Sequence, residues 1–306
     1  MQIGIVAPGR DVRNWSSAIS RHSGIEVQVW PEVTDPHKVE LAIAWNPPPG
    51  LLAKFDNLKL ISSLGAGVDH IISDRQLPDV PVVRIVDENL SRDMSHYILM
   101  SILNYQRGTY RHFLNQQIRH WENSKNPNRN LKVGILGLGV LGKAVSKMLV
   151  YHGFKVIGFS RSPKTIEGVI SYENQEGLRT LMSEIDILIN LLPLTRETKG
   201  ILDMKLFAMA SRPFYLINVA RGGHLVESDL IKALGQGLLT GACLDVFDEE
   251  PLPANSPLWD HNDILVTPHV ASITNPDTVV AQILDNYHRV KEGRELINQI
   301  DLQHGY

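Results

Sequence analysis

A glycine-rich turn between an apolar strand and a helix places the strongest constraint on this chain. In the stretch VGILGLGVLGKAV, Gly137, Gly139 and Gly142 fit the pattern G-x-G-x-x-G. The first glycine permits a tight turn, the second lets the backbone approach a pyrophosphate, and the third lets the helix lie close to the sheet. The stretch therefore predicts a dinucleotide-binding strand, turn and helix. The alternative is a tight turn with a purely structural role.

The end of the next predicted strand lacks the acid that often follows such a turn. An Asp or Glu about 20 residues beyond the glycines accepts hydrogen bonds from ribose hydroxyls, whereas an Arg accommodates a 2′-phosphate. In KVIGFSRSPK this place holds Ser160, Arg161 and Ser162, with Lys164 close behind. We expect NADP(H) to be preferred and NAD(H) to be accepted as well, because one charge-assisted hydrogen bond contributes only about 1.5 to 3 kcal/mol. The alternative is a solvated basic turn.

Strand-like runs alternate with helical segments in two series along the 306 residues. Such alternation favours parallel sheets with crossover helices, and the length suffices for two domains. A long helical stretch beginning near Met94 ends the first series, and the glycine turn opens the second. The last helix, whose start is marked by Asn275 and Pro276, could return to the first domain. We expect an α/β fold with two doubly wound parallel-sheet domains, Rossmann- or flavodoxin-like, and a cleft between them. The predicted substrate domain comprises residues 1–97 and 274–306, and the dinucleotide domain residues 98–273.

Composition excludes several classes of protein. A net charge of −3 without a basic cluster argues against nucleic-acid binding. No apolar run reaches the roughly 18 residues of a membrane span, and the start of the chain lacks the pattern of a signal peptide. Cys243 is the only cysteine, which excludes an internal disulfide and a cysteine-based metal cage. We expect a cytoplasmic protein with no metal, no nucleic-acid partner and no membrane partner.

Three polar residues follow predicted strands of the second series. Arg221 lies in NVARGGHLVE, Glu250 in DVFDEEPLP and His269 in VTPHVA. Singly, they would be a surface ion-pair former, a solvated loop acid and a polar residue at a strand end. Together they are a candidate site, because the carboxyl ends of strands in an open α/β sheet meet the ligand crevice. An Arg in this place can hold a carboxylate with two hydrogen bonds.

The motifs GLGVLG, NVARGG, LDVFDEEPLP and TPHVA, in this order, resemble those of the D-isomer-specific 2-hydroxyacid dehydrogenase family, and the resemblance covers nearly the whole chain. It implies hydride transfer between a nicotinamide and the carbonyl carbon of a 2-oxo acid, with Arg221, Glu250 and His269 as the catalytic set. His269 would give a proton to the carbonyl oxygen, and Glu250 would hold its other ring nitrogen. Arg221 would bind the substrate carboxylate and polarise the carbonyl.

The resemblance also implies substrate and cofactor contacts. The backbone of Ala66, Gly67 and Val68, in SLGAGVDHI, would cradle the substrate carboxylate; a helix-start turn is the alternative. Trp45 would form a wall that favours small side groups; core packing is the alternative. Further cofactor residues would be Val140 and Leu141 at the pyrophosphate, Leu192, Pro193, Val219 and Ala220 along the cofactor, and Asp245 at the nicotinamide carboxamide.

Within the family, WNPPPG, INLLPLT and SPLW are most similar to a subgroup that reduces glyoxylate to glycolate and hydroxypyruvate to D-glycerate. The long helical stretch and its polar tail resemble a dimerisation extension, so a homodimer is expected. His96 departs from the family pattern, since many relatives carry Glu there. Two alternatives stay open. One is a dehydrogenase for a bulkier 2-oxo acid such as phenylpyruvate, and the other is a cofactor-sensing protein like the family's transcriptional corepressors.

Overall fold

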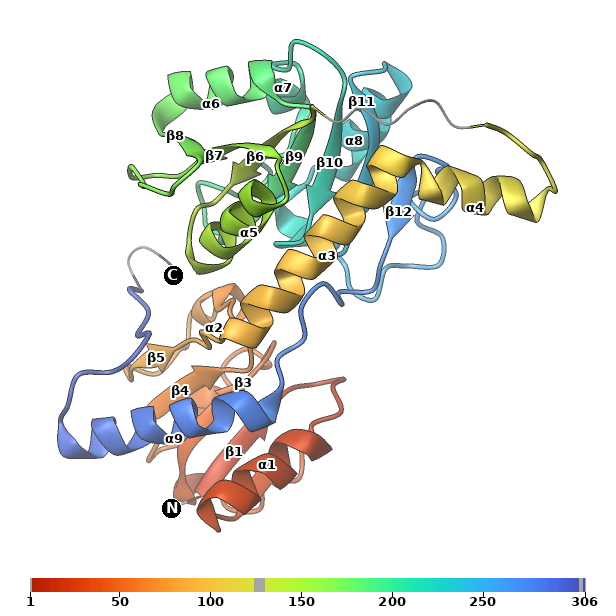
Figure 1. Cartoon of the computed structure of the whole chain (residues 1–306). Coiled ribbons are helices and arrows are strands. Elements are labelled where there is room, and N and C mark those ends of the chain that lie inside the picture. Colours follow the sequence, from red (N-terminus) through yellow and green to blue (C-terminus); the bar gives the residue numbers. More distant parts are fainter. Residues whose placement is uncertain (1, 124–129, 303–304, 306) are drawn as a thin grey trace. The chain divides into compact units, whose positions relative to one another are not determined.

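The chain forms two compact units. The computed structural model describes residues 2–123, 130–302 and 305. One unit comprises Met1–Leu90 and Ile273–Tyr306, and the other comprises Ser91–Ser272 (Figure 1). The sequence analysis placed these divisions after residues 97 and 273. We call the two parts the first unit and the second unit.

The first unit is built on a sheet of five parallel strands in the order β2-β1-β3-β4-β5. This is the order of flavodoxin-like doubly wound sheets, in which ligands bind where the strand order reverses. Here the reversal lies between β1 and β3, and Val6 pairs with Ala44 at their carboxyl ends. The strands are β1 (Gln2–Val6), β2 (Val27–Val29), β3 (Val39–Ala44), β4 (Leu60–Ser63) and β5 (Val82–Val83).

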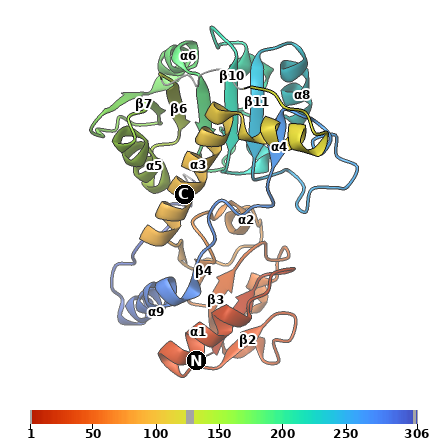
Figure 2. The same cartoon turned by 45° about the vertical axis from the view of Figure 1, so that its right-hand side comes forward.

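Two helices, α1 (Arg13–Ser23) and α9 (Pro276–Glu292), contact each other along one face of this sheet (Figures 1 and 2). As predicted, α9 begins after Asn275, whose side chain accepts a hydrogen bond from the N–H of Asp277. Helix α9 is therefore the segment that returns to the first unit. The remaining short helices of this unit are η1 (Pro36–Lys38), η2 (Leu52–Lys54) and α2 (Asp69–Ile72).

The second unit is built on seven parallel strands in the order β12-β11-β10-β9-β6-β7-β8. Its first six strands follow the Rossmann order 3-2-1-4-5-6, and β12 extends the sheet. The strand order reverses between β6 and β9. The predicted α/β class with two doubly wound parallel sheets is confirmed. The strands are β6 (Lys132–Leu136), β7 (Lys155–Phe159), β8 (Val169–Tyr172), β9 (Ile187–Asn190), β10 (Phe214–Asn218), β11 (Leu239–Leu244) and β12 (Ile264–Val266).

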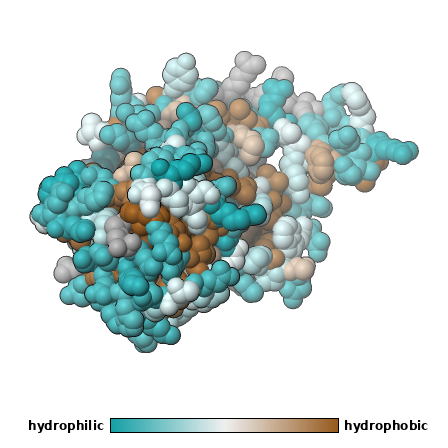
Figure 3. Space-filling view, turned by 90° about the horizontal axis from the view of Figure 1, so that it is seen from below, coloured by the Kyte–Doolittle hydropathy of each residue, from teal (hydrophilic) through white to brown (hydrophobic). Residues whose placement is uncertain are grey.

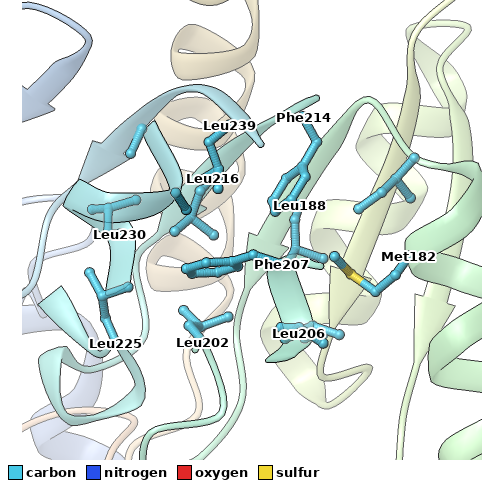
Figure 4. Packing of buried hydrophobic residues seen from close by; sticks show 14 of the residues in the cluster. Met182, Leu188, Leu202, Leu206, Phe207, Phe214, Leu216, Leu225, Leu230 and Leu239 are labelled. Carbon is cyan, nitrogen blue, oxygen red and sulfur yellow. The ribbon is translucent and has the colours of Figure 1, made fainter. Parts of the chain in front are cut away.

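Helices cover both faces of the second sheet because its strands alternate apolar side chains between two cores. In β9, Ile187 and Ile189 pack into the core with α3 and α5, whereas Leu188 packs into the core with α6, α7 and α8 (Figure 4). Such strands, buried on both faces, are typical of parallel sheets. The helices are α3 (Glu88–Arg107), α5 (Val140–Tyr151), α6 (Asn174–Glu184), α7 (Met204–Phe207) and α8 (Glu227–Gly235), with the short η3 (Gly222–His224).

The single helical stretch predicted from Met94 is in fact two helices. Helix α3 begins earlier, at Glu88, and ends at Arg107, and α4 spans Thr109–Gln117. Between them Gly108 has a φ of 63°, a left-handed conformation that interrupts a helix and that glycine adopts without steric cost. Residues 124–129 of the predicted polar boundary loop lie outside the described residues.

None of the helices among the described residues is long and apolar enough to cross a membrane. Hydrophilic residues cover much of the face shown in Figure 3.

Candidate functional site

The glycine turn after β6 requires glycine at two of its three positions for steric reasons. Gly137 has a φ of 97°, and a Cβ atom built on it would lie 2.7 Å from the carbonyl oxygen of Leu191. A Cβ atom on Gly142 would lie 1.9 Å from the carbonyl oxygen of Gly137, so α5 begins directly against the turn. Gly139 is exposed, with no atom within 4 Å of its Cβ position. These are the properties that the motif requires for a tight turn, close helix packing and an open approach for a ligand.

The start of α5 is suited to an anion. Gly139 is the N-cap and no side chain caps the helix there. The first N–H groups of a helix, here from Val140 onward, have no partner within the helix, and they lie at the positive end of its dipole. Helix α5 is 12 residues long, and its start lies at the point where the strand order of the sheet reverses. This is the place at which doubly wound sheets bind phosphate groups.

The Ser-Arg-Ser turn lies beside the glycine turn because β6 and β7 are neighbouring strands. The N–H of Gly137 donates to the carbonyl oxygen of Phe159, at 2.8 Å, one residue before the turn. Ser160 is buried, and its hydroxyl donates to the carbonyl oxygen of Ser162 at 2.7 Å. Arg161 is exposed. Ser160 therefore shapes the turn, while Arg161 and Ser162 are exposed to solvent.

The charge of Arg161 acts on the carboxylate of Glu197. Sequence reasoning missed this acid. The pKa of Glu197 is lowered, first by a hydrogen bond with the Thr195 side chain and then, to a smaller extent, by the charges of Arg196 and Arg161. Glu197 belongs to the loop after β9, far from Arg161 in the sequence. The absence of an acid in KVIGFSRSPK thus did not exclude one from the surroundings of this turn.

Two wholly buried asparagines organise the loops after β9 and β10. The side-chain amide of Asn190 donates to Oδ1 of Asn218 at 3.0 Å. Oδ1 of Asn190 accepts from the N–H of Leu192, and Oδ1 of Asn218 from the N–H of Ala220. Sequence reasoning missed this pair, although a polar residue ending each apolar run, in ILIN and YLIN, was a usable signal. The loops carry the predicted cofactor residues Leu192, Pro193, Val219 and Ala220.

His224 joins the same two loops, and sequence reasoning missed it as well. Its side chain is fully buried in η3. Nδ1 lies 3.1 Å from the carbonyl oxygen of Arg221, and Nε2 lies 3.2 Å from the carbonyl oxygen of Pro193. The imidazole therefore holds the backbone of Arg221 against the loop that follows β9. No pattern in NVARGGHLVE distinguished this histidine.

The structure brings the predicted residues Arg221, Glu250 and His269 together in the second unit. Nδ1 of His269 lies 2.7 Å from Oε2 of Glu250. Oε1 of Glu250 accepts from the N–H of Phe247 at 3.0 Å, and the charge of Arg221 acts on the same carboxylate. Because a carboxylate only accepts hydrogen bonds, Nδ1 is the donor, and Nε2 is the ring nitrogen turned away from Glu250.

The electrostatics of this group favour a charged Glu250. Burial alone would raise the pKa of Glu250. The hydrogen bonds from His269 and from the N–H of Phe247, together with the charges of His269 and Arg221, outweigh burial and hold this pKa below its ordinary value. The arrangement can therefore hold an imidazole in one orientation and supply a negative charge next to it.

Asp245 anchors the segment that carries His269. Its carboxylate is 1% exposed and accepts from the hydroxyl of Thr267 at 2.6 Å and from the N–H groups of Val270 and Ala271 at 2.9 Å. Its backbone oxygen accepts from the N–H of His269 at 2.8 Å. Burial raises the pKa of Asp245. The predicted cofactor residue Asp245 is thus engaged with the protein through both carboxylate oxygens.

In the first unit, Trp45 follows β3 at the carboxyl edge of the sheet and is half-buried. The Arg10 guanidinium lies 4.2 Å from the centre of its ring, and the His70 ring lies 4.3 Å from it. A Cβ atom on Gly65 would lie 3.1 Å from the indole, so the ring rests on the loop after β4. Trp45 thus lies at the carboxyl edge of the sheet, where doubly wound sheets bind ligands, and it also packs against the core of the first unit.

The predicted carboxylate cradle lies in the loop between β4 and α2. The hydroxyl of Ser63 donates to the carbonyl oxygen of Gly67 at 2.7 Å, which bends the loop back on the strand. Among the described residues, the N–H groups of Ala66, Gly67 and Val68 donate to no acceptor. They are available to an anion. His96, which departs from the family pattern, is an exposed residue of α3 in the second unit.

The sequence of this chain is similar to those of known proteins over its whole length. The family model described as "D-isomer specific 2-hydroxyacid dehydrogenase, NAD binding domain" matches residues 99–271. The chain is 40% identical to glyoxylate/hydroxypyruvate reductase A of Photorhabdus laumondii subsp. laumondii, and 38% identical to glyoxylate/hydroxypyruvate reductase A of Yersinia enterocolitica. Each alignment covers 100% of both chains.

Solved structures are similar over the same length. A D-isomer specific 2-hydroxyacid dehydrogenase from Xanthobacter autotrophicus Py2, in complex with NADPH and MES, has a TM-score of 0.93 and 39% identity. An NADPH-dependent glyoxylate/hydroxypyruvate reductase from Sinorhizobium meliloti, in complex with NADP and sulfate, has a TM-score of 0.93 and 35% identity. Both matches cover 100% of this chain and 99% of the other.

Proposed function

Because this chain belongs to the D-isomer-specific 2-hydroxyacid dehydrogenase family, we propose that it reduces small 2-oxo acids with NADPH, glyoxylate to glycolate and hydroxypyruvate to D-glycerate. The observation that carries the proposal is the 2.7 Å hydrogen bond between His269 and Glu250, together with the charge of Arg221, which acts on the Glu250 carboxylate. The relatives named as glyoxylate/hydroxypyruvate reductases support this substrate class.

His269 acts as the general acid in this mechanism. NADPH, when bound, supplies the hydride to the carbonyl carbon. As negative charge develops on the carbonyl oxygen, Nε2 of His269 delivers a proton to it. Glu250 holds Nδ1 and supplies the negative charge that stabilises the imidazolium before transfer. Arg221 orients the substrate carboxylate and polarises the carbonyl.

We assign the cofactor site to the carboxyl edge of the second sheet. The open space at Gly139 and the uncapped start of α5 fit a pyrophosphate. Arg161 is assigned to the 2′-phosphate, and the relatives solved with NADPH and NADP support this preference. NAD(H) remains a weaker cofactor. The assigned residues are Gly137, Gly139, Val140, Leu141, Gly142, Ser160, Arg161, Ser162, Leu192, Pro193, Val219, Ala220 and Asp245.

In the first unit, we assign the N–H groups of Ala66, Gly67 and Val68 to the substrate carboxylate. Trp45 is assigned to the side group of the substrate. A large indole fixed by Arg10, His70 and Gly65 leaves little room for a bulky side group. Glyoxylate and hydroxypyruvate are therefore favoured over phenylpyruvate.

The test is the loss of NADPH absorbance with glyoxylate, hydroxypyruvate and phenylpyruvate, repeated with NADH. We expect kcat/KM to be greatest for NADPH with one of the two small acids. His269→Ala should lower kcat about 100-fold or more, the usual contribution of a general acid. A preference for phenylpyruvate would favour a bulkier physiological substrate. No turnover with any of these acids would favour a cofactor-sensing protein.

We also propose that the chain works as a homodimer in the cytoplasm. Three large apolar side chains lie exposed on α4 and just after it, and 91% of Trp121 is accessible. Exposed apolar side chains that lie close together are characteristic of association surfaces. Cys243 is the only cysteine of the sequence and is buried, so the fold does not depend on an internal disulfide, which is compatible with a reducing compartment. The three apolar residues are Phe113, Ile118 and Trp121.

A further inference from the structure

A chain of hydrogen bonds runs from α3 to the carboxylate that anchors the His269 segment. The phenol oxygen of Tyr97 lies 2.5 Å from the hydroxyl oxygen of Thr267. That hydroxyl lies 2.6 Å from Oδ1 of Asp245. Asp245 is 1% exposed, and Tyr97 and Thr267 are both partly buried. The three residues come from α3, from the segment after β12 and from the end of β11.

The protonation states of the three side chains determine which group donates in each of these hydrogen bonds. Burial raises the pKa of the Tyr97 phenol above its ordinary value, so the phenol stays protonated near neutral pH and can donate. The single hydroxyl proton of Thr267 points to the Asp245 carboxylate, which only accepts. The Thr267 oxygen must therefore accept from Tyr97. Each hydrogen bond in such a chain polarises the next, so the Tyr97 hydroxyl strengthens the bond that Thr267 gives to Asp245.

Asp245 in turn holds His269 in an unusual backbone conformation. His269 has a φ of 54°, in the left-handed region that costs a non-glycine residue of the order of 1 kcal/mol or more. The N–H of His269 donates to the backbone oxygen of Asp245, and the N–H groups of Val270 and Ala271 donate to its carboxylate. These bonds compensate for the strained backbone and set the direction in which the imidazole leaves the loop.

We propose that Tyr97 is a positioning residue of the reductase, which acts through Thr267 to hold the Asp245 carboxylate, and with it the His269 segment, in the productive position. The inference rests on the proposed function, because it assigns Tyr97 a role in a reaction in which His269 is the acid.

We call the hydrogen bonds from Tyr97 through Thr267 to Asp245 the relay. Its loss should change the pH dependence of activity through the pKa of Asp245. The ionisable groups facing its carboxylate are Tyr97 of α3, Cys243 of β11 and His269 after β12. Burial raises the pKa of Asp245, and the bond from Thr267 opposes this rise. Loss of the relay must therefore raise that pKa further. The acid limb of the kcat/KM profile should then move to higher pH, because Asp245 is protonated and releases the segment earlier.

The experiment measures kcat/KM for glyoxylate against pH in the wild type and in Tyr97→Phe, Thr267→Val, Thr267→Ser and the Tyr97→Phe/Thr267→Val double variant. Tyr97→Phe should lower kcat/KM about threefold to tenfold, the effect of one hydrogen bond. Thr267→Val should lower it about tenfold to a hundredfold, because it removes a bond to a charged group. Both should move the acid limb to higher pH, and Thr267→Ser should stay within about twofold of the wild type.

The double variant is the decisive arm. Because Tyr97 acts through Thr267, the double variant should be no worse than Thr267→Val alone. Fold-losses that multiply, or an acid limb that does not move in Tyr97→Phe, would overturn the proposal. Tyr105→Phe is the matched control on the same helix. Within the described part of the chain, the Tyr105 hydroxyl takes part in a hydrogen bond with the hydroxyl of Thr240 alone, so its loss should leave both the rate and the acid limb unchanged.

The melting temperature Tm, measured against pH, tests the relay without any enzymatic turnover, so failure of the relay can be distinguished from failure of the proposed function. The folded pKa of Asp245 lies above its unfolded value, so the stability it contributes is full below the unfolded pKa and is lost as the pH rises through the folded pKa. The Tm deficit of Tyr97→Phe should therefore be largest at pH values above the folded pKa of Asp245 and should shrink as the pH falls toward its unfolded pKa. If the wild type reduces no 2-oxo acid, the proposed function fails while this arm still tests the relay. A deficit that does not change with pH would count against the relay itself.

Discussion

Gly222 and Phe247 are in direct backbone contact: a Cβ atom built on Gly222 would fall 1.8 Å from the carbonyl carbon of Phe247. Real Cβ atoms essentially never approach another atom closer than 3.0 Å. The contact presses the loop after β10, which carries Arg221, against the loop after β11, which carries Glu250. A single missing side chain therefore permits the grouping of two site residues that are far apart in the sequence.

Gly222→Ala should consequently separate the two loops. We expect the variant to lose about 1 to 3 kcal/mol of stability, as overpacking usually does, and to lose more kcat/KM than stability alone explains. Differential scanning fluorimetry and steady-state rates measure the two effects. Gly235→Ala is the matched control, because its Cβ position near the end of α8 has no atom within 4 Å. Equal behaviour of the two variants would contradict the steric argument.

Glu250→Gln should lower kcat/KM about tenfold to a hundredfold, because the amide can still accept from Nδ1 of His269 but supplies no negative charge. The pKa of Glu250 is lowered, so the stabilisation it contributes is present above the unfolded pKa and is lost as the pH falls through the folded pKa. The activity of the wild type attributable to this charge should therefore persist below the ordinary Glu value of about 4.5. A pH–rate series that also includes Glu249→Gln, the exposed neighbour, checks the effect. A Glu249→Gln enzyme as slow as Glu250→Gln would exclude a specific role for Glu250.

Arg161→Ala should lower kcat/KM for NADPH about tenfold to more than a hundredfold and leave the value for NADH within about twofold, because the side chain is assigned to the 2′-phosphate alone. Parallel titrations with the two cofactors measure the ratio. Lys155→Ala, at the opposite end of β7, is the control for loss of a surface charge. Equal losses with NADPH and NADH would assign Arg161 to the common part of the cofactor.

Replacement of Glu197, the carboxylate near the Ser-Arg-Ser turn, should change the preference for NADPH in the opposite direction to Arg161→Ala. Glu197 lies in the charge field of Arg161 and disfavours a second anion there. Glu197→Gln should raise the NADPH to NADH ratio, and the increase should vanish in an Arg161→Ala background. An increase that survives in that background would show that Glu197 acts independently of Arg161.

Trp45→Ala should shift substrate selectivity toward larger side groups. Removal of the indole also removes the ring on which Arg10 and His70 rest, so the wall is lost rather than moved. We expect the ratio of kcat/KM for phenylpyruvate to that for glyoxylate to rise about tenfold, typical of a change in one pocket wall. The exposed aromatic Tyr151, replaced by Ala, is the control. An unchanged ratio would place Trp45 outside the substrate pocket.

Phe113→Ser combined with Trp121→Ser should convert a homodimer into a monomer, because it removes two of the exposed apolar side chains near α4. Sedimentation velocity of the wild type and the variant measures the change. Ile170→Ser, at an exposed apolar position on β8, is the control and should leave the mass unchanged. A wild type that sediments as a monomer would refute the homodimer proposal.

The local features of this protein were readable from the sequence because their causes are local. The glycine spacing in GLGVLG predicts a turn in which two of the three positions accept only glycine, and the φ of 97° at Gly137 together with the steric limit at Gly142 agrees with this prediction. Alternating strands and helices predicted parallel sheets, since a parallel connection requires a crossover. The start of α9 was also readable, because Asn275 and Pro276 act on the helix directly after them.

The break in the long helix depended on a conformation that the sequence only permits. A glycine can also occur within a continuous helix, so Gly108 alone did not predict a break. Its left-handed φ is a property of the folded structure, in which α3 ends and α4 begins at this residue. The sequence thus predicted the helical character of this stretch but not its division. Helix α3 also begins six residues before Met94, directly after Asp87, whose side chain accepts from the N–H of Asn89. The sequence interpretation missed this capping signal.

The sequence by itself determined the turn chemistry, the two parallel sheets and the identity of the polar residues at the strand ends, because each depends on neighbours along the chain. Only the tertiary structure decided which of those residues meet. The His269–Glu250 hydrogen bond, the hold of Asp245 on the His269 segment, the link through His224 and the approach of Glu197 to Arg161 join loops after different strands. Their distances follow from strand order and loop packing, such as the contact of Gly222 with Phe247, and these are long-range properties that no local pattern encodes.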